Sequence, residues 1–277
     1  MTKLLTAGFM RLKKDHLFLL LLLFTLGLAC FMIYTQYLDL KRYHEVIELD
    51  QLLMNNITIT GIVIAVFTSL FVGREYSDGT LRNKMIIGCS RTKIYLSNLL
   101  LVIEVSVFVE ILHLIIISLM GIPIFGTLKM TLSSFSLIVF CILVMILAFC
   151  SIFTFIAMVV SNKTIGAITS ILFAFFMMMA GITLLTRIEA PKYIESAQMT
   201  NAETKEFEIK KEKNPRYLTT KQRKVYRHIL NFIPSGQAFV IAGRMDTNYR
   251  LLPWYSFGVI LLFTSAGIFL FQKKELK

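Results

Sequence analysis

Residues 135–160 read FSLIVFCILVMILAFCSIFTFIAMVV, twenty-six positions without a charged side chain. An α-helix rises about 1.5 Å per residue, so this stretch is long enough to cross a hydrocarbon layer of about 30 Å. Its apolar residues are continuous and do not alternate with polar ones, which favours a helix over a strand of a membrane barrel. The stretch therefore predicts a transmembrane helix.

Comparable apolar stretches lie on both sides of it along the 277-residue chain, which is 56% hydrophobic with a mean hydropathy of +0.70. The first is longer than the apolar core of a signal peptide, so we expect an uncleaved span. The fold expected is an all-α polytopic membrane protein, a single transmembrane domain over 1–277. The six expected spans are residues 17–37, 57–73, 96–122, 135–160, 165–186 and 254–271.

Lysine and arginine in the connections predict the orientation. They are concentrated before the first span, in residues 74–95 and in the tail after the last span. Because short cytoplasmic connections carry such an excess, both termini and residues 74–95 are expected in the cytoplasm. The 67-residue segment 187–253 is then extracellular, and long loops are exempt from the rule. The net charge of +12 arises in these connections, so we expect a lipid bilayer and no nucleic acid as its partner.

The residues before the first span have the spacing of an amphipathic helix. Leu5, Phe9 and Leu12 recur on one face, and Lys3 and Lys14 fall on another. This pattern predicts a helix that lies in the cytoplasmic interface of the membrane. A continuous extension of the first span is the alternative.

Residues 74–93, REYSDGTLRNKMIIGCSRTK, interrupt the apolar pattern between the second and third spans. Asp78-Gly79 is a turn signal, Thr80 can cap a following helix over 81–87, and Gly88 suits its end. Connections between helices usually need only about 2–8 residues, so this one is long for a linker. With Leu81 and Met85 on one face, the short helix is expected to present apolar residues to a partner's groove.

The wider stretch REYSDGTLRNKMIIGCSRTKIYLSNLL, residues 74–100, resembles the segment between the second and third spans of type-two ABC exporter permeases. In that family this segment is a coupling helix that receives force from a cytosolic ATPase. The resemblance implies that residues 74–95 are the ATPase-coupling segment of this chain. The coupling residues so implied are Glu75, Gly79, Thr80, Leu81, Arg82, Met85 and Arg91.

A second stretch, RHILNFIPSGQAF at 227–239, looks like the segment before the last span in Firmicute members of the same family. There it forms re-entrant or interfacial helices near the external exit, which makes Asn231, Pro234 and Gly236 candidates for an external gate. The charged insert ETKEFEIKKEKNPRYLTTKQRKVYR departs from many relatives by its length.

Polar side chains inside the spans are candidates for a translocation path. A charge at the centre of a span costs about 2.5–3.5 kcal/mol, so Glu110 is not expected to face lipid, and His113 can meet it one turn away. In the resembled family, the second and fifth spans of two copies face each other across the pathway. Hydrogen bonding between helices, or to a hydroxyl's own helix backbone, is the alternative. The candidates are Thr60, Thr68, Glu110, His113, Thr169 and Thr183.

The chain has no G-x-x-x-x-G-K-[ST] phosphate loop, and its cysteines lack the spacing of a metal site. We therefore expect no enzyme activity, cofactor or metal in this chain, and ATP and Mg²⁺ in the partner. The resemblance implies a permease in a bacterial cell membrane, paired with a second copy or a paralogue and with two ATPase chains. It would export an amphipathic or antimicrobial peptide, a lipid-like molecule or a drug.

Two other functions remain open at this point. A secondary transporter would show an inverted repeat and broken helices at the midplane. A membrane sensor or assembly protein would use the outer loop to bind a ligand.

Overall fold

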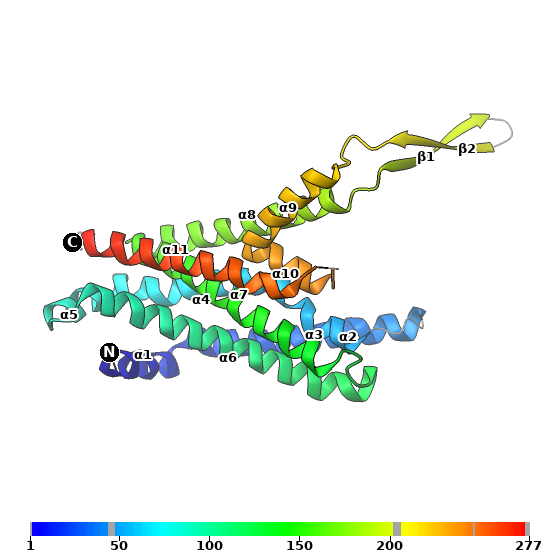
Figure 1. The fold of residues 1–277 in the computed structure, drawn as a ribbon. Coiled ribbons are helices and arrows are strands. Elements are labelled where there is room, and N and C mark those ends of the chain that lie inside the picture. Colours follow the sequence, from blue (N-terminus) through cyan, green and yellow to red (C-terminus); the bar gives the residue numbers. More distant parts are fainter. Residues whose placement is uncertain (1, 44–47, 202–205, 246, 275–277) are drawn as a thin grey trace.

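The computed structural model describes residues 2–43, 48–201, 206–245 and 247–274. Within them the chain is almost entirely helical, with one two-stranded antiparallel sheet (Figure 1). The elements are α1 (Thr2–Lys14), α2 (His16–Tyr43), α3 (Leu49–Asn55), α4 (Ile57–Ser77), α5 (Thr80–Ile86), α6 (Arg91–Phe125), α7 (Leu132–Val159), α8 (Lys163–Glu189), β1 (Tyr193–Asn201), β2 (Glu206–Lys213), α9 (Thr220–Phe232), α10 (Pro234–Ala242), the 3₁₀ helix η1 (Tyr249–Leu251) and α11 (Leu252–Lys273).

Six helical segments of the described residues are long and apolar enough to cross a membrane. They are α2, α3 with α4, α6, α7, α8, and η1 with α11, and each coincides with one expected span, although α7 ends one residue before the expected end at position 160. Two of these helices, α7 and α8, begin before the expected apolar runs, at polar capping residues. Thr131 accepts the Ser134 N–H at the start of α7, and Asn162 accepts two backbone N–H groups at the start of α8. The prediction of an all-α protein with six spans is confirmed.

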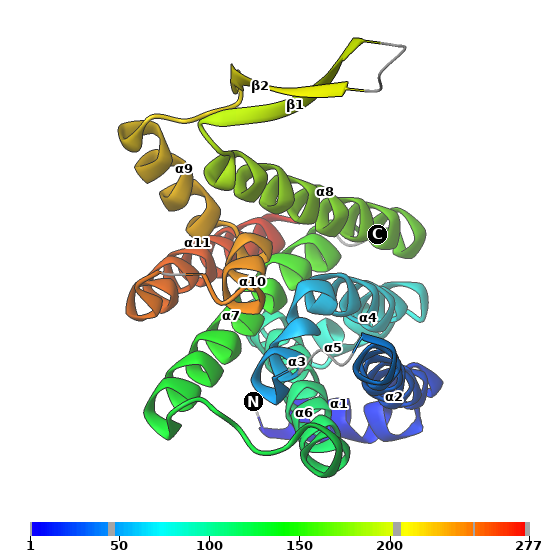
Figure 2. The ribbon, with the colours of Figure 1, turned by 90° about the vertical axis from the view of Figure 1, so that its right-hand side faces the viewer.

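The fourth span, α7, lies inside the bundle, with α4, α6, α8 and α11 against it, whereas α2 stands at the margin (Figure 2). Phe149 and Phe153 of α7 are fully buried. A Cβ on Gly61 of α4 would lie 2.6 Å from the Phe149 ring, so the missing side chain lets these helices approach closely. The unbroken apolar sequence of α7 is thus explained by burial on most sides.

The N-terminal helix α1 is separate from the first span. The chain breaks at Asp15, whose carboxylate accepts the backbone N–H of Leu17 at 2.9 Å and so caps α2. Figure 2 shows α1 running across the edge of the bundle, and Leu12 is buried against it. Of the two alternatives, a distinct helix is therefore correct and a continuous extension of the first span is wrong.

The described residues of segment 187–253 include regular secondary structure, where the sequence predicted a loop. It contains the β1–β2 hairpin, which projects from the body (Figure 1), followed by α9 and α10. The strands pair antiparallel, with Tyr193 opposite Lys213. This hairpin was not predicted from the sequence. Helix α9 begins with a capping box in which Thr219 and Gln222 bond reciprocally.

The two termini and α5 lie at one end of the molecule, and the hairpin and α3 at the other (Figure 1). This arrangement follows from an even number of spans. Successive connections between spans therefore alternate between the two ends of the bundle.

Candidate functional site

The connection between α4 and α6 is a short helix between two glycines. Gly79 has φ of 67° and Gly88 has φ of 90°, both in the left-handed region that favours glycine. The turn, helix and stop therefore occur as expected. Thr80 does not cap α5, however, because its hydroxyl donates instead to the Glu75 carbonyl oxygen at 3.1 Å.

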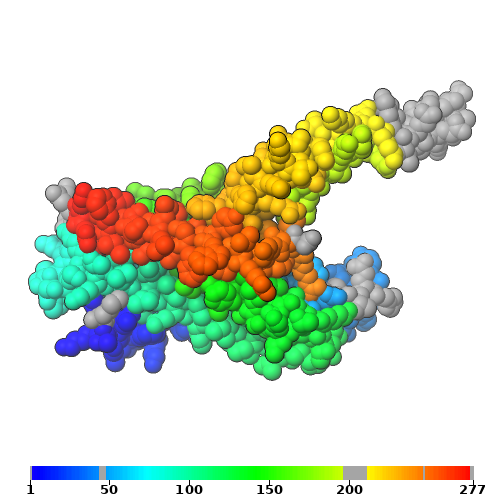
Figure 3. Space-filling model, in the orientation of Figure 1, coloured from blue at the N-terminus to red at the C-terminus, as the bar shows by residue number. Residues whose placement is uncertain are grey.

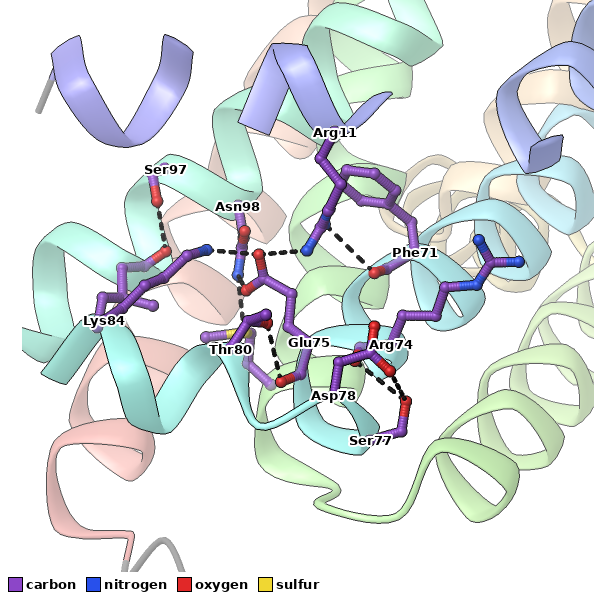
Figure 4. A network of polar contacts seen from close by, with 12 residues as sticks. Arg11, Phe71, Arg74, Glu75, Ser77, Asp78, Thr80, Lys84, Ser97 and Asn98 are labelled. Atoms are coloured by element: carbon purple, nitrogen blue, oxygen red, sulfur yellow. Dashed lines mark hydrogen bonds and ion pairs between the residues drawn. The ribbon is translucent and has the colours of Figure 1, made fainter. Parts of the chain in front are cut away.

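A buried carboxylate joins this connection to the rest of the molecule. Glu75, in the last turn of α4, is 1% exposed. It accepts hydrogen bonds from Arg11 of α1 at 2.6 Å and from Asn98 of α6 at 2.8 Å, and it pairs with Lys84 of α5 (Figure 4). Two cations and an amide offset the cost of removing the carboxylate from water. We call these four residues the Glu75 cluster, and they come from four different helices.

Two further contacts hold α1 and its linker to the end of α4. The Arg11 guanidinium lies 4.0 Å from the centre of the Phe71 ring. Asp15, between α1 and α2, accepts a hydrogen bond from Arg74 at 2.5 Å. The N-terminal helix is therefore attached to the same turn of α4 that carries Glu75.

The exposed surface of α5 differs from the expected one. Leu81 is 2% exposed and packs inward, so the prediction that its face is presented to a partner is wrong. Arg82 and Ile86, four residues apart, share the opposite face, and Ile86 and Ile87 are 74% and 81% exposed. Met85 is half-buried. Figure 3 shows α5 as the outermost part of the end that carries the termini.

The C-terminal end of the chain is attached beside α5. Arg91, at the start of α6, donates to the carbonyl oxygens of Phe271 and Gln272 at 3.1 and 2.9 Å, and to that of Lys274. The Lys274 ammonium donates to the Tyr76 hydroxyl at 2.8 Å, and burial lowers the pKa of Lys274 to about 8. Arg91 thus joins α6 to α11.

Three of the six candidate path residues line one small cavity, of about 40 Å³, between α2, α4 and α6: Thr60, Glu110 and His113. The Asn56 side-chain amide donates to the Glu110 carboxylate at 3.2 Å. The Thr60 hydroxyl donates to its own helix backbone at 3.2 Å. Glu110 is therefore both bonded between helices and placed at a cavity.

The other three lie apart from this cavity. Thr68 is fully buried in α4, whereas Thr169 and Thr183 are exposed on α8. The Thr183 hydroxyl donates to the Met179 carbonyl oxygen at 2.7 Å. Within a single copy of the chain, the six residues do not assemble into one path.

Asn231, Pro234 and Gly236 form the corner between α9 and α10. Pro234 is the first residue of α10, where its missing N–H removes no helical hydrogen bond. A Cβ on Gly236 would lie 2.1 Å from the Leu230 carbonyl oxygen, so the corner requires glycine. The Asn231 carbonyl oxygen accepts a hydrogen bond from the Gln237 amide at 2.7 Å. The structure therefore brings all three gate candidates together.

At the end opposite α5, an ion-pair cluster joins three segments. Arg244, after α10, pairs with Glu48 and, at 3.0 Å, with Asp50 of α3. Asp50 also accepts the backbone N–H groups of Lys129 and Met130, at 3.2 and 3.1 Å. The hydrogen bond from Arg244 holds the pKa of Glu48 below its usual value. These residues, the Arg244 cluster, border a cleft of about 550 Å³.

Glu75 was predicted from the sequence, but its partners and the Arg244 cluster were not. Arg11 and Asn98 lie 64 and 23 positions from Glu75, and no local pattern links residues so far apart. The only available signal was Asn98 itself, a polar amide early in an apolar span, where it needs a partner. Ile86 and Ile87 were visible in the sequence, but only the packing of Leu81 shows that they face outward.

The six apolar helices make the chain a multi-pass membrane protein, and its short helix between the second and third spans is held by a buried ionic cluster. Residues 4–181 match the family model described as ABC-2 family transporter protein, and the chain belongs to this family. It is therefore an ABC transporter permease, a membrane subunit that works with an ABC ATPase subunit. The family resemblance inferred from residues 74–100 is confirmed. A search of curated protein sequences finds no significant match.

Proposed function

We propose that this chain is the membrane-spanning subunit of an ATP-driven exporter and that its partner ATPase binds α5. One observation carries the proposal: α5 presents Ile86 and Ile87 outward while Lys84 ties it to buried Glu75. Exposed apolar side chains on a short, fixed helix suit a groove on a partner protein. The family's partnership with an ATPase supplies the partner.

Force applied to α5 has a defined route into the bundle. The Lys84–Glu75 ion pair passes it to the last turn of α4, and Glu75 passes it to Arg11 of α1 and Asn98 of α6. Arg91 extends the connection to the end of α11. ATP and Mg²⁺ act in the ATPase subunits, whose closure on ATP tilts these helices together.

The proposed assembly contains two copies of this chain, or one copy and a paralogue, with two ATPase subunits. Thr169 and Thr183, exposed on α8, face the partner copy across the pathway together with hydroxyls of α4. Both termini and α5 lie in the cytoplasm of a bacterial cell, and the hairpin and α9 lie outside. The lysines and arginines of residues 74–95, at the end shared with the termini, support this orientation.

The cargo proposed is an amphipathic or antimicrobial peptide, a lipid-like molecule or a drug. The α9–α10 corner, with Asn231, Pro234 and Gly236, acts as the external gate through which it leaves. The tight contact between Gly236 and the Leu230 carbonyl supports movement of this corner as a unit.

Co-purification with its ABC ATPase subunit tests the proposal. Ile86→Asp and Ile87→Asp place charges in the proposed contact and should reduce recovery of the ATPase by about tenfold or more, as loss of a central apolar contact does. Val225→Asp is the matched control, because Val225 is an exposed apolar residue on α9. Full recovery of the ATPase with both isoleucine variants would overturn the proposal. Flux driven by an ion gradient without an ATPase would instead indicate a secondary transporter.

A further inference from the structure

Two adjoining cavities lie on the inner side of α2, and they differ in chemistry. One is the small cavity lined by Glu110 and His113, and the other is an apolar groove of about 400 Å³ between α2 and α4. Both are lined by Leu21, Phe24, Val63 and Phe67, so the two cavities share part of their walls. Together they form a site with a polar end and an apolar end.

The polar end holds side chains whose hydrogen-bonding capacity is unused. Glu110 Oε1, Asn56 Oδ1 and both ring nitrogens of His113 are buried and have no partner within the described residues. The three residues are 3%, 6% and 1% exposed. Buried polar atoms nearly always have partners, and each one left without costs about 1–3 kcal/mol. A ligand or water is therefore needed to complete this end of the site.

The residues that line the polar end indicate that the ligand carries a positive charge. Glu110 and Asn56, each with an unpartnered oxygen, line the cavity, and the described residues that line it include no lysine or arginine. A positive donor would pair with Glu110, whereas an anion would be repelled by it. A cavity of about 40 Å³ has room for only about three water-sized groups, so the charged group must be small.

The apolar end accepts a chain. Its lining runs along α4 from Ile62 to Leu70 and along α2 from Leu17 to Phe24. At about 1.5 Å per residue, the α4 side is about 12 Å long. Leu20 and Phe24, which line the groove, are 59% and 52% exposed, so the groove opens at the outer surface of the bundle.

We propose that the α2–α4 groove binds a cationic amphiphile, with its primary ammonium group on Glu110 and its hydrocarbon chain in the apolar end. This assignment rests on the proposed function, for which it names a substrate class. It places a substrate-binding site within one copy of the chain, between its first three spans. His113 and the Asn56 oxygen accept hydrogen bonds from the ammonium group or from a water beside it.

Equilibrium binding to the full chain in phosphatidylcholine nanodiscs tests this assignment. The probes are radiolabelled dodecylamine, dodecanol and dodecanoate, which share a chain and differ in charge. The amine should show saturable binding about tenfold or more tighter than the alcohol, and the carboxylate should not bind. Equal binding of amine and alcohol would indicate chain filling alone and would overturn the proposal.

Two variants locate the site. Glu110→Gln should reduce amine affinity to that of the alcohol, while Glu104→Gln, on an exposed position of the same helix, should leave it unchanged. Val63→Phe blocks the groove and should weaken binding of both the amine and the alcohol. This variant keeps the test valid if the Glu110 variant does not fold. Equal effects of the two glutamine variants, or no effect of Val63→Phe, would contradict the assignment. Absence of amine binding to the assembled dimer would also contradict the assignment. A second copy of the chain packed against α2 would have this effect.

This test separates the substrate site from the proposed coupling to an ATPase. Amine binding is measured without nucleotide. The substrate site would therefore still stand if the Ile86 and Ile87 variants failed to reduce recovery of the ATPase. Conversely, ATP-dependent export with no preference for the amine would contradict the proposed substrate site but would still support an exporter.

Discussion

The Glu75 carboxylate, at the end of the second span, accepts a hydrogen bond at 2.8 Å from the side-chain amide of Asn98, about two turns into α6. Neither group reaches water, since Glu75 is 1% exposed and Asn98 is fully buried. The bond joins the two helices on either side of α5 directly. Arg11 and Lys84 then add α1 and α5 to the same carboxylate. The connection expected to meet the ATPase is thus held to the bundle through Lys84, while Ile86 and Ile87 remain exposed.

Glu75→Gln should destabilise the folded permease by about 3 kcal/mol, because it leaves the cations of Arg11 and Lys84 without their buried partner. The measurement is the fraction of monodisperse protein that remains after heating in detergent. Asp78→Asn is the control, since Asp78 lies in the same connection and is exposed. Equal heat resistance of the two variants would show that the cluster contributes no stability.

A double-mutant cycle between Arg11 and Glu75 should give an interaction energy of about 1–3 kcal/mol, the range for residues in direct contact. Arg11→Gln alone should release α1 from the bundle, which increases cleavage of the N-terminal segment by trypsin. The same cycle between Lys3 and Glu75 should be additive, because no contact joins Lys3 to the cluster among the described residues. Additivity in the Arg11 cycle would mean that the ion pair does not form in the membrane.

Gly236→Ala should destabilise the protein by about 1–3 kcal/mol, since its Cβ would lie 2.1 Å from a backbone oxygen that cannot move freely. Gly258→Ala on α11 is the matched control, with no atom within 4 Å of the added carbon. Helix propensity favours alanine at the control position. Thermal denaturation of both variants measures the difference, and comparable losses would rule out a specific strain at the α9–α10 corner.

The stability difference between the wild type and Glu48→Gln should depend on pH in one direction. Arg244 holds the pKa of Glu48 below that of the unfolded chain, so its ion pair stabilises the fold at pH values above about 4.3, the usual glutamate pKa. As the pH falls through the lowered pKa, the carboxylate is protonated and this contribution is lost. Thermal stability measured from pH 8 downward should show a constant difference that shrinks only in acid.

Glu189→Gln, an exposed glutamate at the end of α8, provides the comparison for that series. Its stability should follow the wild type at every pH. A Glu48→Gln difference that grew as the pH fell would have the wrong sign for an ion pair with Arg244.

The sequence alone determined the membrane class, the six spans, the short helix after Gly79 and the family. These features are local: an apolar run long enough to span the bilayer must be helical in lipid, and glycine with its neighbours sets the turns. The resemblance of residues 74–100 depended on side chains close together in the chain. Each of these properties can be recognised in a continuous stretch of residues.

Only the tertiary structure decided which side chains meet. It paired Glu75 with residues 64 and 23 positions away, turned Leu81 inward and Ile86 outward, and joined Arg244 to Glu48 across 196 positions. The physical reason is that a buried charge needs a partner but does not specify which one. The packing of α1, α4, α5 and α6 makes that choice, because it brings Arg11, Lys84 and Asn98 within hydrogen-bonding distance of a single carboxylate.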